Sequence, residues 1–123
     1  MFNCEIMKIS QDYAEKNPSG HSGTNFKGEW MGENLFWSHG RKSVDGGFPV
    51  DEWYNEISFY NFETGKSIDE KVTGHFTQVV WKNSKELGIG YYCQNTDCTV
   101  VGNYFPGGNY NDDYLNQVQN LQK

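Results

Sequence analysis

The chain has 123 residues, a length typical of one globular domain that buries a single hydrophobic core. Its 8 Tyr, 8 Phe and 4 Trp supply bulky core material and its 14 Gly indicate many loops, a composition that argues against intrinsic disorder. Lys and Arg number 10 against 16 Asp and Glu, a net charge of −6, and no basic run exceeds Arg41-Lys42, which argues against a nucleic-acid partner. No apolar run approaches the roughly 20 residues of a transmembrane helix, and the first residues lack a secretory signal pattern.

The first half of the chain predicts two helices separated by a strand. Apolar residues at helical spacing predict one helix over residues 2–16 and another over residues 50–61. Pro49 stands at the start of the second helix, where its missing N–H donor is tolerated. A short apolar run between turn residues predicts a strand over residues 34–38, and the polar, glycine-bounded segment 63–74 is typical of a loop.

The second half of the chain predicts a short helix followed by a β-hairpin. Phe76, Val79 and Val80 stand at helical spacing and predict the third helix. Residues 87–93 and 98–105 are rich in β-forming residues, and the polar residues between them predict a hairpin tip. The elements together predict an α+β fold in one domain without internal repeats.

The three cysteines leave one without an evident partner. Cys93 and Cys98 flank the predicted hairpin tip, so they form either a disulfide across the two strands or two free thiols, and we favour the disulfide. Cys4 has no cysteine near it in the sequence. We expect Cys4 to be buried as a small hydrophobic residue, rather than to form a bridge with a cysteine outside this chain.

Four polar residues merit attention as candidate site residues, although each alone has an ordinary structural explanation. Glu56 lies at the edge of an apolar helical stripe, where a glutamate usually reaches water. His75 at the start of the third helix could be a core histidine, and His21 and Glu33 lie in glycine-rich sequence where polar residues are common. Imidazole and carboxylate groups suit zinc, but these spacings match no local zinc motif, so the side chains must converge in space.

Several longer sequence motifs resemble those of a known protein family. Residues 74–84, GHFTQVVWKNS, resemble at every position the leading signature of the CAP superfamily, which comprises cysteine-rich secretory, antigen 5 and pathogenesis-related proteins. GENLFW at 32–37, EWYNEISFYNF at 52–62 and ELGIGYYC at 86–93 also resemble that family, in the expected order. Four ordered motifs that together cover most of the chain are far more specific than one short pattern.

The resemblance implies a fold and a site. The fold is a three-layer α-β-α sandwich with a short antiparallel sheet. The site is a cleft in which two histidines and two glutamates converge, here His21, Glu33, Glu56 and His75. The resemblance further implies that this cleft can bind zinc, mainly through His21 and His75, with the carboxylates hydrogen-bonded to the imidazoles or to a metal-bound water.

The chain departs from the family pattern at two places. Gly102 stands where the second family signature normally has a cysteine, a feature in which the chain resembles the Golgi-associated pathogenesis-related branch. The family's first helix has no counterpart ahead of Met1, so we expect residues 1–123 to form one CAP domain that is truncated at its N-terminus. The missing helix would leave apolar surface exposed on the remaining helices.

The resemblance implies a binding protein with a secreted defence, venom or host-interaction role. Sterols or other lipids are the expected ligands, and the family's sterol-binding loop corresponds to the region 63–74, which is polar and charged in this chain. An extracellular location is expected, with a cytosolic or Golgi-membrane-associated location as the alternative.

Two other functions use the same residues. In a zinc-dependent hydrolase, His21 and His75 would hold zinc while Glu33 or Glu56 served as general base, although no HExxH motif is present. In a structural module, the four residues would only order the cleft, and surface loops would bind a protein partner. Binding is the preferred hypothesis, and an enzymatic activity is left open.

Overall fold

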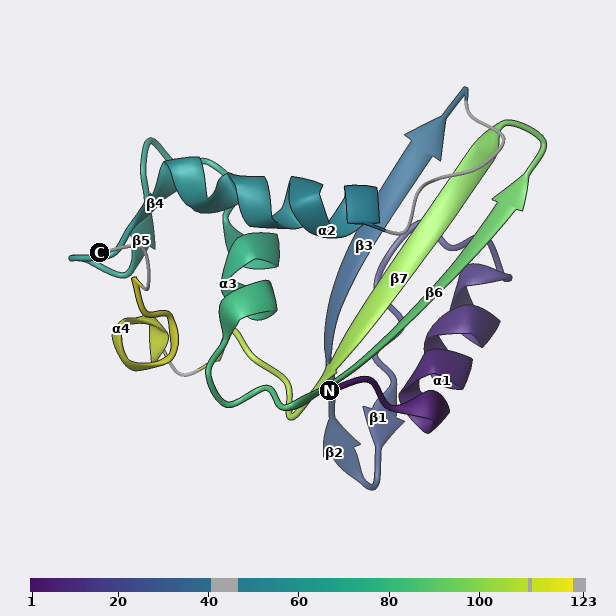
Figure 1. Ribbon diagram of the computed structural model, residues 1–123, viewed down its shortest axis with the longest axis horizontal. Coiled ribbons are helices and arrows are strands. Elements are labelled where there is room, and N and C mark those ends of the chain that lie inside the picture. The colour runs from purple at the N-terminus through teal and green to yellow at the C-terminus, as the bar shows by residue number, and fades with distance from the viewer. Residues whose placement is uncertain (41–46, 111, 121–123) are drawn as a thin grey trace.

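A three-stranded antiparallel sheet lies between helices on its two sides (Figure 1). The structure is a computed structural model that describes residues 1–40, 47–110 and 112–120, so Arg41-Lys42 lies outside the described residues. The strands lie in the order β3 (Gly32–His39), β7 (Asp97–Phe105) and β6 (Glu86–Gln94). The three predicted strands are therefore confirmed, each slightly longer than expected.

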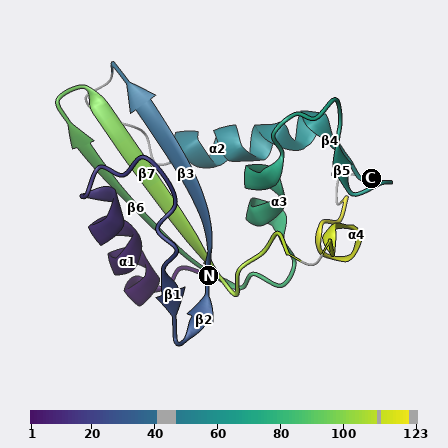
Figure 2. The ribbon, with the colours of Figure 1, turned by 180° about the vertical axis from the view of Figure 1, so that it is seen from behind.

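Helices cover both faces of the sheet, which confirms the α-β-α sandwich. Helix α1 (Cys4–Ala14) packs along β6 and β7, as Figure 2 shows from behind. Helices α2 (Gly47–Tyr54) and α3 (Gly74–Val80) pack against each other, and α3 reaches β3 on the other side of the molecule.

Helix α1 begins two residues later than predicted, with Asn3 as its N-cap. The Asn3 side-chain oxygen accepts hydrogen bonds from the backbone N–H groups of Glu5 and Ile6, at 2.9 and 3.1 Å. Phe2, expected inside the helix, instead forms a parallel β-bridge with Leu87.

The expectation that Cys4 is buried is wrong, because Cys4 is an exposed free cysteine. The buried residues of α1 are Ile6, Ser10 and Ala14, which recur every four residues and form one stripe against the sheet. Cys4 lies two residues before Ile6, and this offset places it away from that stripe.

Close backbone approach holds α1 against the sheet. A Cβ atom on Gly88 would lie 2.3 Å from the backbone nitrogen of Met7, and one on Gly90 would lie 2.4 Å from the Cα atom of Gln11. The buried Ser10 hydroxyl donates to the carbonyl oxygen of Gly88 at 2.9 Å and accepts from the Asn103 amide at 2.8 Å. Glycine is therefore required sterically on β6 beneath the helix.

The predicted helix over residues 50–61 is shorter and less regular than expected. Helix α2 ends at Tyr54, a 3-10 helix follows over Asn55–Phe59, and Tyr60–Asn61 then forms strand β4. Tyr60 turns inward to pack with Phe76 in a buried aromatic cluster, and its strand pairs with β5 (Lys66–Ser67). The segment expected to be a loop thus contains one short strand.

Three further elements were not predicted from the sequence. Strands β1 (Asn25–Phe26) and β2 (Glu29–Trp30) form a small hairpin before β3, and helix α4 (Tyr114–Gln117) follows the sheet. Each has four residues or fewer, too short to show a periodicity.

The predicted disulfide between Cys93 and Cys98 is present. The two residues face each other in the register of β6 and β7, with Cα atoms 4.0 Å apart, so the bond closes the tip of the hairpin. Within the described residues, no helix has the length and apolar character needed to span a bilayer.

Candidate functional site

Glu33 forms the first of two histidine–glutamate pairs. It lies near the start of β3, and its side chain is only 7% exposed. One carboxylate oxygen lies 3.0 Å from Nδ1 of His21 and accepts the backbone N–H of Ser22 at 2.9 Å, while the other accepts the Ser22 hydroxyl at 2.5 Å. The carboxylate therefore fixes the otherwise irregular segment that carries His21.

Glu56 forms the second pair, with His75. Its carboxylate lies 2.8 Å from Nδ1 of His75 and also accepts the backbone N–H of Phe76 at 2.9 Å. The imidazole of His75 lies parallel to the Trp53 ring, with an interplanar angle of 8°. Contacts with a carboxylate and an aromatic ring thus fix the orientation of His75. They also explain why Glu56 faces the protein rather than water.

The two pairs share one chemical arrangement. A carboxylate only accepts hydrogen bonds, so each neutral histidine carries its proton on Nδ1 and presents an unprotonated Nε2. Among the described residues, neither Nε2 atom has a hydrogen-bond partner. Each Nε2 therefore has a lone pair that can accept a hydrogen bond or bind a cation.

A cavity of about 280 Å³ lies beside the first pair, between β3 and α3. His21, Glu33 and the half-exposed Trp30 line one side, and Gln78 and Asn109 lie on its wall. The structure does not place Glu56 or His75 in this lining. The second pair is connected to the cavity through α3, because Gln78 of the lining lies one turn after His75 on this helix.

Three side-chain amides tie α3, which carries His75, to β3 and to residues 108–109. The Asn34 amide donates to the carbonyl oxygen of His75 at 3.1 Å and so joins β3, next to Glu33, to the start of α3. Asn109 donates to the carbonyl oxygen of Gly74 at 2.8 Å, and the buried Gln78 accepts the backbone N–H of Gly108 at 2.9 Å. None of these residues was predicted as a site residue, although Asn34 belongs to the motif GENLFW and Gln78 to the signature GHFTQVVWKNS.

The interior next to the cleft is strongly desolvated. Tyr104 of β7 is 5% exposed, and burial raises the pKa of its phenol well above the ordinary value. A hydrogen bond with Asn34, at 3.4 Å, offsets part of that rise. Asn34 is thus held between a neutral phenol and the carbonyl oxygen of His75.

The structure brings the four candidate residues together as two pairs. In the part of the chain that the structure describes, no three His, Cys, Asp or Glu side chains gather closely enough to hold a metal ion. Convergence of His21 and His75 on a single metal ion stays a prediction.

The class of protein is indicated by an antiparallel sheet between helical layers, together with two histidine–glutamate pairs of which the first lines a cleft. Residues 1–104 match the family model described as CAP, the cysteine-rich secretory protein family. The chain belongs to this family, as its motifs indicated.

Relatives of known sequence include proteins from animals and plants. The chain is 37% identical over 108 residues to Golgi-associated plant pathogenesis-related protein 1 of Homo sapiens, covering 87% of this chain and 67% of the relative. It is 32% identical to pathogenesis-related protein 1C of Nicotiana tabacum, covering 85% of this chain and 62% of the relative. The chain therefore spans about two thirds of the length of these relatives.

Solved structures agree with the fold. Venom allergen-like protein 4 of Schistosoma mansoni superposes with a TM-score of 0.72 at 21% identity, over 89% of this chain and 68% of that one. A crystal structure of NaASP2 with Zn2+ superposes with a TM-score of 0.69 at 26% identity, over 89% of this chain and 61% of that one.

Proposed function

We propose that this CAP domain is a binding module whose cleft takes a divalent metal ion through Nε2 of His21 and Nε2 of His75. The observation that carries the proposal is the pairing of each Nδ1 with a buried or half-buried carboxylate. Zinc-bound histidines generally donate their other ring N–H to such a group, which fixes the tautomer and strengthens the ligand. The similarity to NaASP2, described with Zn2+, supports the same conclusion.

The carboxylates have a positioning role in this proposal. Glu33 and Glu56 hold the protons on Nδ1, so that both Nε2 lone pairs remain available to the ion. A bound divalent ion would supply a Lewis-acidic centre that attracts oxygen atoms of a ligand. Two histidines leave the remaining coordination positions to water or to that ligand.

Thermal unfolding with and without zinc tests the metal site. We expect zinc to stabilise the parent chain by about 2.7 kcal/mol at roughly one hundred times its dissociation constant, and to leave a His21→Ala, His75→Ala double variant unaffected. His39, the third histidine of the chain, provides a matched control, and His39→Ala should keep the full zinc response. An equal response of the parent and the double variant, or no response in either, contradicts the proposal.

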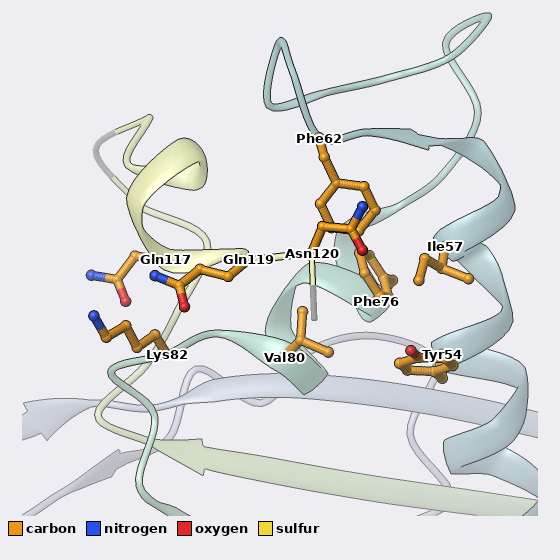
Figure 3. Close-up of a pocket in the computed structure, with 9 residues that line it drawn as sticks. All are labelled: Tyr54, Ile57, Phe62, Phe76, Val80, Lys82, Gln117, Gln119 and Asn120. Carbon is orange, nitrogen blue, oxygen red and sulfur yellow. The ribbon is translucent and has the colours of Figure 1, made fainter. Parts of the chain in front are cut away.

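A second binding function, for a lipid, is favoured by a separate cavity of about 280 Å³ (Figure 3). Its apolar lining comes from the end of α2, the 3-10 helix, the residue after β4, and α3, and comprises Tyr54, Ile57, Phe62, Phe76 and Val80. Lys82 and Gln117 lie together on another side of the cavity (Figure 3). An apolar lining with a cation and amides at its edge suits an alkyl chain that carries an anionic or polar head.

The volume of this cavity bears on the kind of lipid. Ligand sites generally measure about 300–1,000 Å³, so this cavity of about 280 Å³ lies just below that range, and its small volume favours a single alkyl chain over the fused rings of a sterol. Residues 63–74, all of them described, contribute nothing to the lining, which includes Phe62 before this segment and Phe76 after it. We therefore place the lipid site beside the loop that the family resemblance implies, and not in it.

Binding of cis-parinaric acid, a fluorescent fatty acid, distinguishes the two lipid sites. We expect Val80→Glu to weaken binding about tenfold or more, because it places a carboxylate inside the apolar lining. Val72→Glu is the matched control, since Val72 is 66% exposed in the polar loop, and it should bind like the parent. Loss of binding in Val72→Glu alone would assign the lipid to the loop.

We propose an extracellular location and a defence or host-interaction role. The disulfide between Cys93 and Cys98 supports that location, because such bonds persist mainly in oxidising compartments. The similarity to plant pathogenesis-related proteins supports that role.

A further inference from the structure

One end of the central sheet is left uncovered by α1. Ala14, in the last turn of this helix, packs against Leu35 of β3 and Val101 of β7. The chain then turns away through residues 17–19, while both strands continue beyond the end of the helix. The α1 face of the sheet is thus accessible past Leu35 and Val101.

Strand alternation determines which side chains lie on that accessible face. Trp37 and His39 follow Leu35 at steps of two residues, and Thr99 and Asp97 precede Val101 in the same way. The register pairs Trp37 with Thr99 and His39 with Asp97. Two cross-strand pairs therefore lie side by side on the α1 face.

These side chains and the turn after α1 form a cavity of about 390 Å³, which we call the terminal sheet pocket. It is lined by Asn17, Pro18, Ser19, Trp37, His39, Asp97, Cys98 and Thr99. Trp37 and His39 lie at the end of β3 and Glu33 lies near its start, and the pocket shares no lining residue with the cleft, so the two are separate.

The tryptophan in this pocket is both exposed and held in place. The indole N–H of Trp37 donates to the carbonyl oxygen of Pro18 at 2.9 Å, and the side chain has 42% of its surface exposed. A hydrogen-bonded indole loses less conformational freedom when a ligand stacks on it, which lowers the entropic cost of binding. Large exposed aromatic surfaces of this kind are typical of binding sites.

The polar groups of the pocket still have free hydrogen-bonding capacity. Nδ1 of His39 lies 3.0 Å from one Asp97 oxygen, which orients both side chains. Among the described residues, the second Asp97 oxygen, Nε2 of His39 and the Ser19 hydroxyl have no hydrogen-bond partner. A neutral His39 that donates from Nδ1 to Asp97 has an unprotonated Nε2, so the pocket offers two acceptors, this nitrogen and the Asp97 oxygen, and one hydroxyl that can donate or accept.

We propose that the terminal sheet pocket binds a neutral saccharide, with the apolar face of a β-linked pyranose stacked on Trp37. The C–H face of such a ring is flat and apolar and matches an indole, while its hydroxyl groups match Asp97, His39 and Ser19. The Asp97 carboxylate and the net charge of −6 disfavour an anionic ligand. The proposal is independent of the metal and lipid sites.

Titration with cellotetraose, followed by backbone and indole NMR chemical shifts, tests this proposal. We expect shifts confined to the terminal sheet pocket, and an increase in dissociation constant of about tenfold in Trp37→Ala. Tyr91→Ala is the matched control, because Tyr91 is a 52% exposed aromatic residue of the same sheet on its opposite face, and it should bind like the parent. Absence of shifts in the parent, or equal affinity in Trp37→Ala, would overturn the proposal.

A second variant keeps the proposal testable if Trp37→Ala does not fold. Asp97 is 58% exposed at the start of β7, so Asp97→Ala should fold and should bind cellotetraose several-fold more weakly. Tetramethylammonium is the opposing probe, because a carboxylate beside an indole also suits an organic cation. Binding of tetramethylammonium without binding of cellotetraose would replace the saccharide with a cationic ligand.

Discussion

Replacing Gly88 by alanine should lower the free energy of unfolding by about 3 kcal/mol, a large effect for one methyl group. The added Cβ would lie 2.3 Å from the backbone nitrogen of Met7 and 2.4 Å from the carbonyl carbon of Ile6. Both are backbone atoms of α1, so the helix would have to move away from β6. That movement would stretch the buried hydrogen bond from the Ser10 hydroxyl to the Gly88 carbonyl oxygen. Urea unfolding measures the loss.

Gly20→Ala is the matched control for this substitution. A Cβ atom on Gly20 would meet nothing within 4 Å, and its backbone is free of the left-handed conformation that disfavours alanine. We expect a change within about 0.5 kcal/mol for this variant. If Gly20→Ala and Gly88→Ala lowered the free energy of unfolding by the same amount, the loss in Gly88→Ala could not be assigned to the close packing of α1 on β6.

Glu33→Ala should also lower the free energy of unfolding by about 3 kcal/mol. The buried carboxylate accepts several hydrogen bonds, and its removal leaves their donors without an acceptor. Its loss leaves the N–H and the hydroxyl of Ser22 without their acceptor and frees the imidazole of His21. The same variant should weaken zinc binding about 10- to 100-fold, as expected for a group that orients a metal ligand. Urea unfolding and isothermal calorimetry with zinc measure the two effects.

Glu29→Ala is the matched control for both measurements, since Glu29 is an exposed glutamate on the neighbouring β2 strand. We expect little change in stability or in zinc affinity for this variant. A destabilised Glu33→Ala that binds zinc like the parent would limit Glu33 to the structural role considered in the sequence analysis. Unchanged stability would show that the Ser22 contacts contribute little to folding.

Local patterns in the sequence were sufficient to predict the main helices and strands. The apolar stripe of α1 and the β-rich runs of β6 and β7 are set by neighbouring residues, whose spacing shows the buried side of each element directly. The disulfide could be predicted because residues 93 and 98 flank one hairpin tip. The family motifs identified all four members of the histidine–glutamate pairs.

Features that depend on distant packing could not be predicted in this way. The end of α2 at Tyr54 follows from the inward turn of Tyr60 to meet Phe76, a contact between segments far apart in the chain. The exposure of Cys4 follows from how α1 rotates onto the sheet, which is governed by the contacts of Ile6 and by the glycines of β6.

By itself, the sequence determined the family, the order of the three longer strands and of α1, α2 and α3, and the residues of the two pairs, because periodicity and motifs are local properties of the chain. Only the tertiary structure decided how those residues pair, since His21 with Glu33 and Glu56 with His75 join separate segments. The tertiary structure alone also created the terminal sheet pocket, because its exposure depends on where α1 ends above the strands. Such contacts depend on the packing and hydrogen bonding of several elements that are far apart in the sequence. They cannot be predicted from the spacing of residues within one segment.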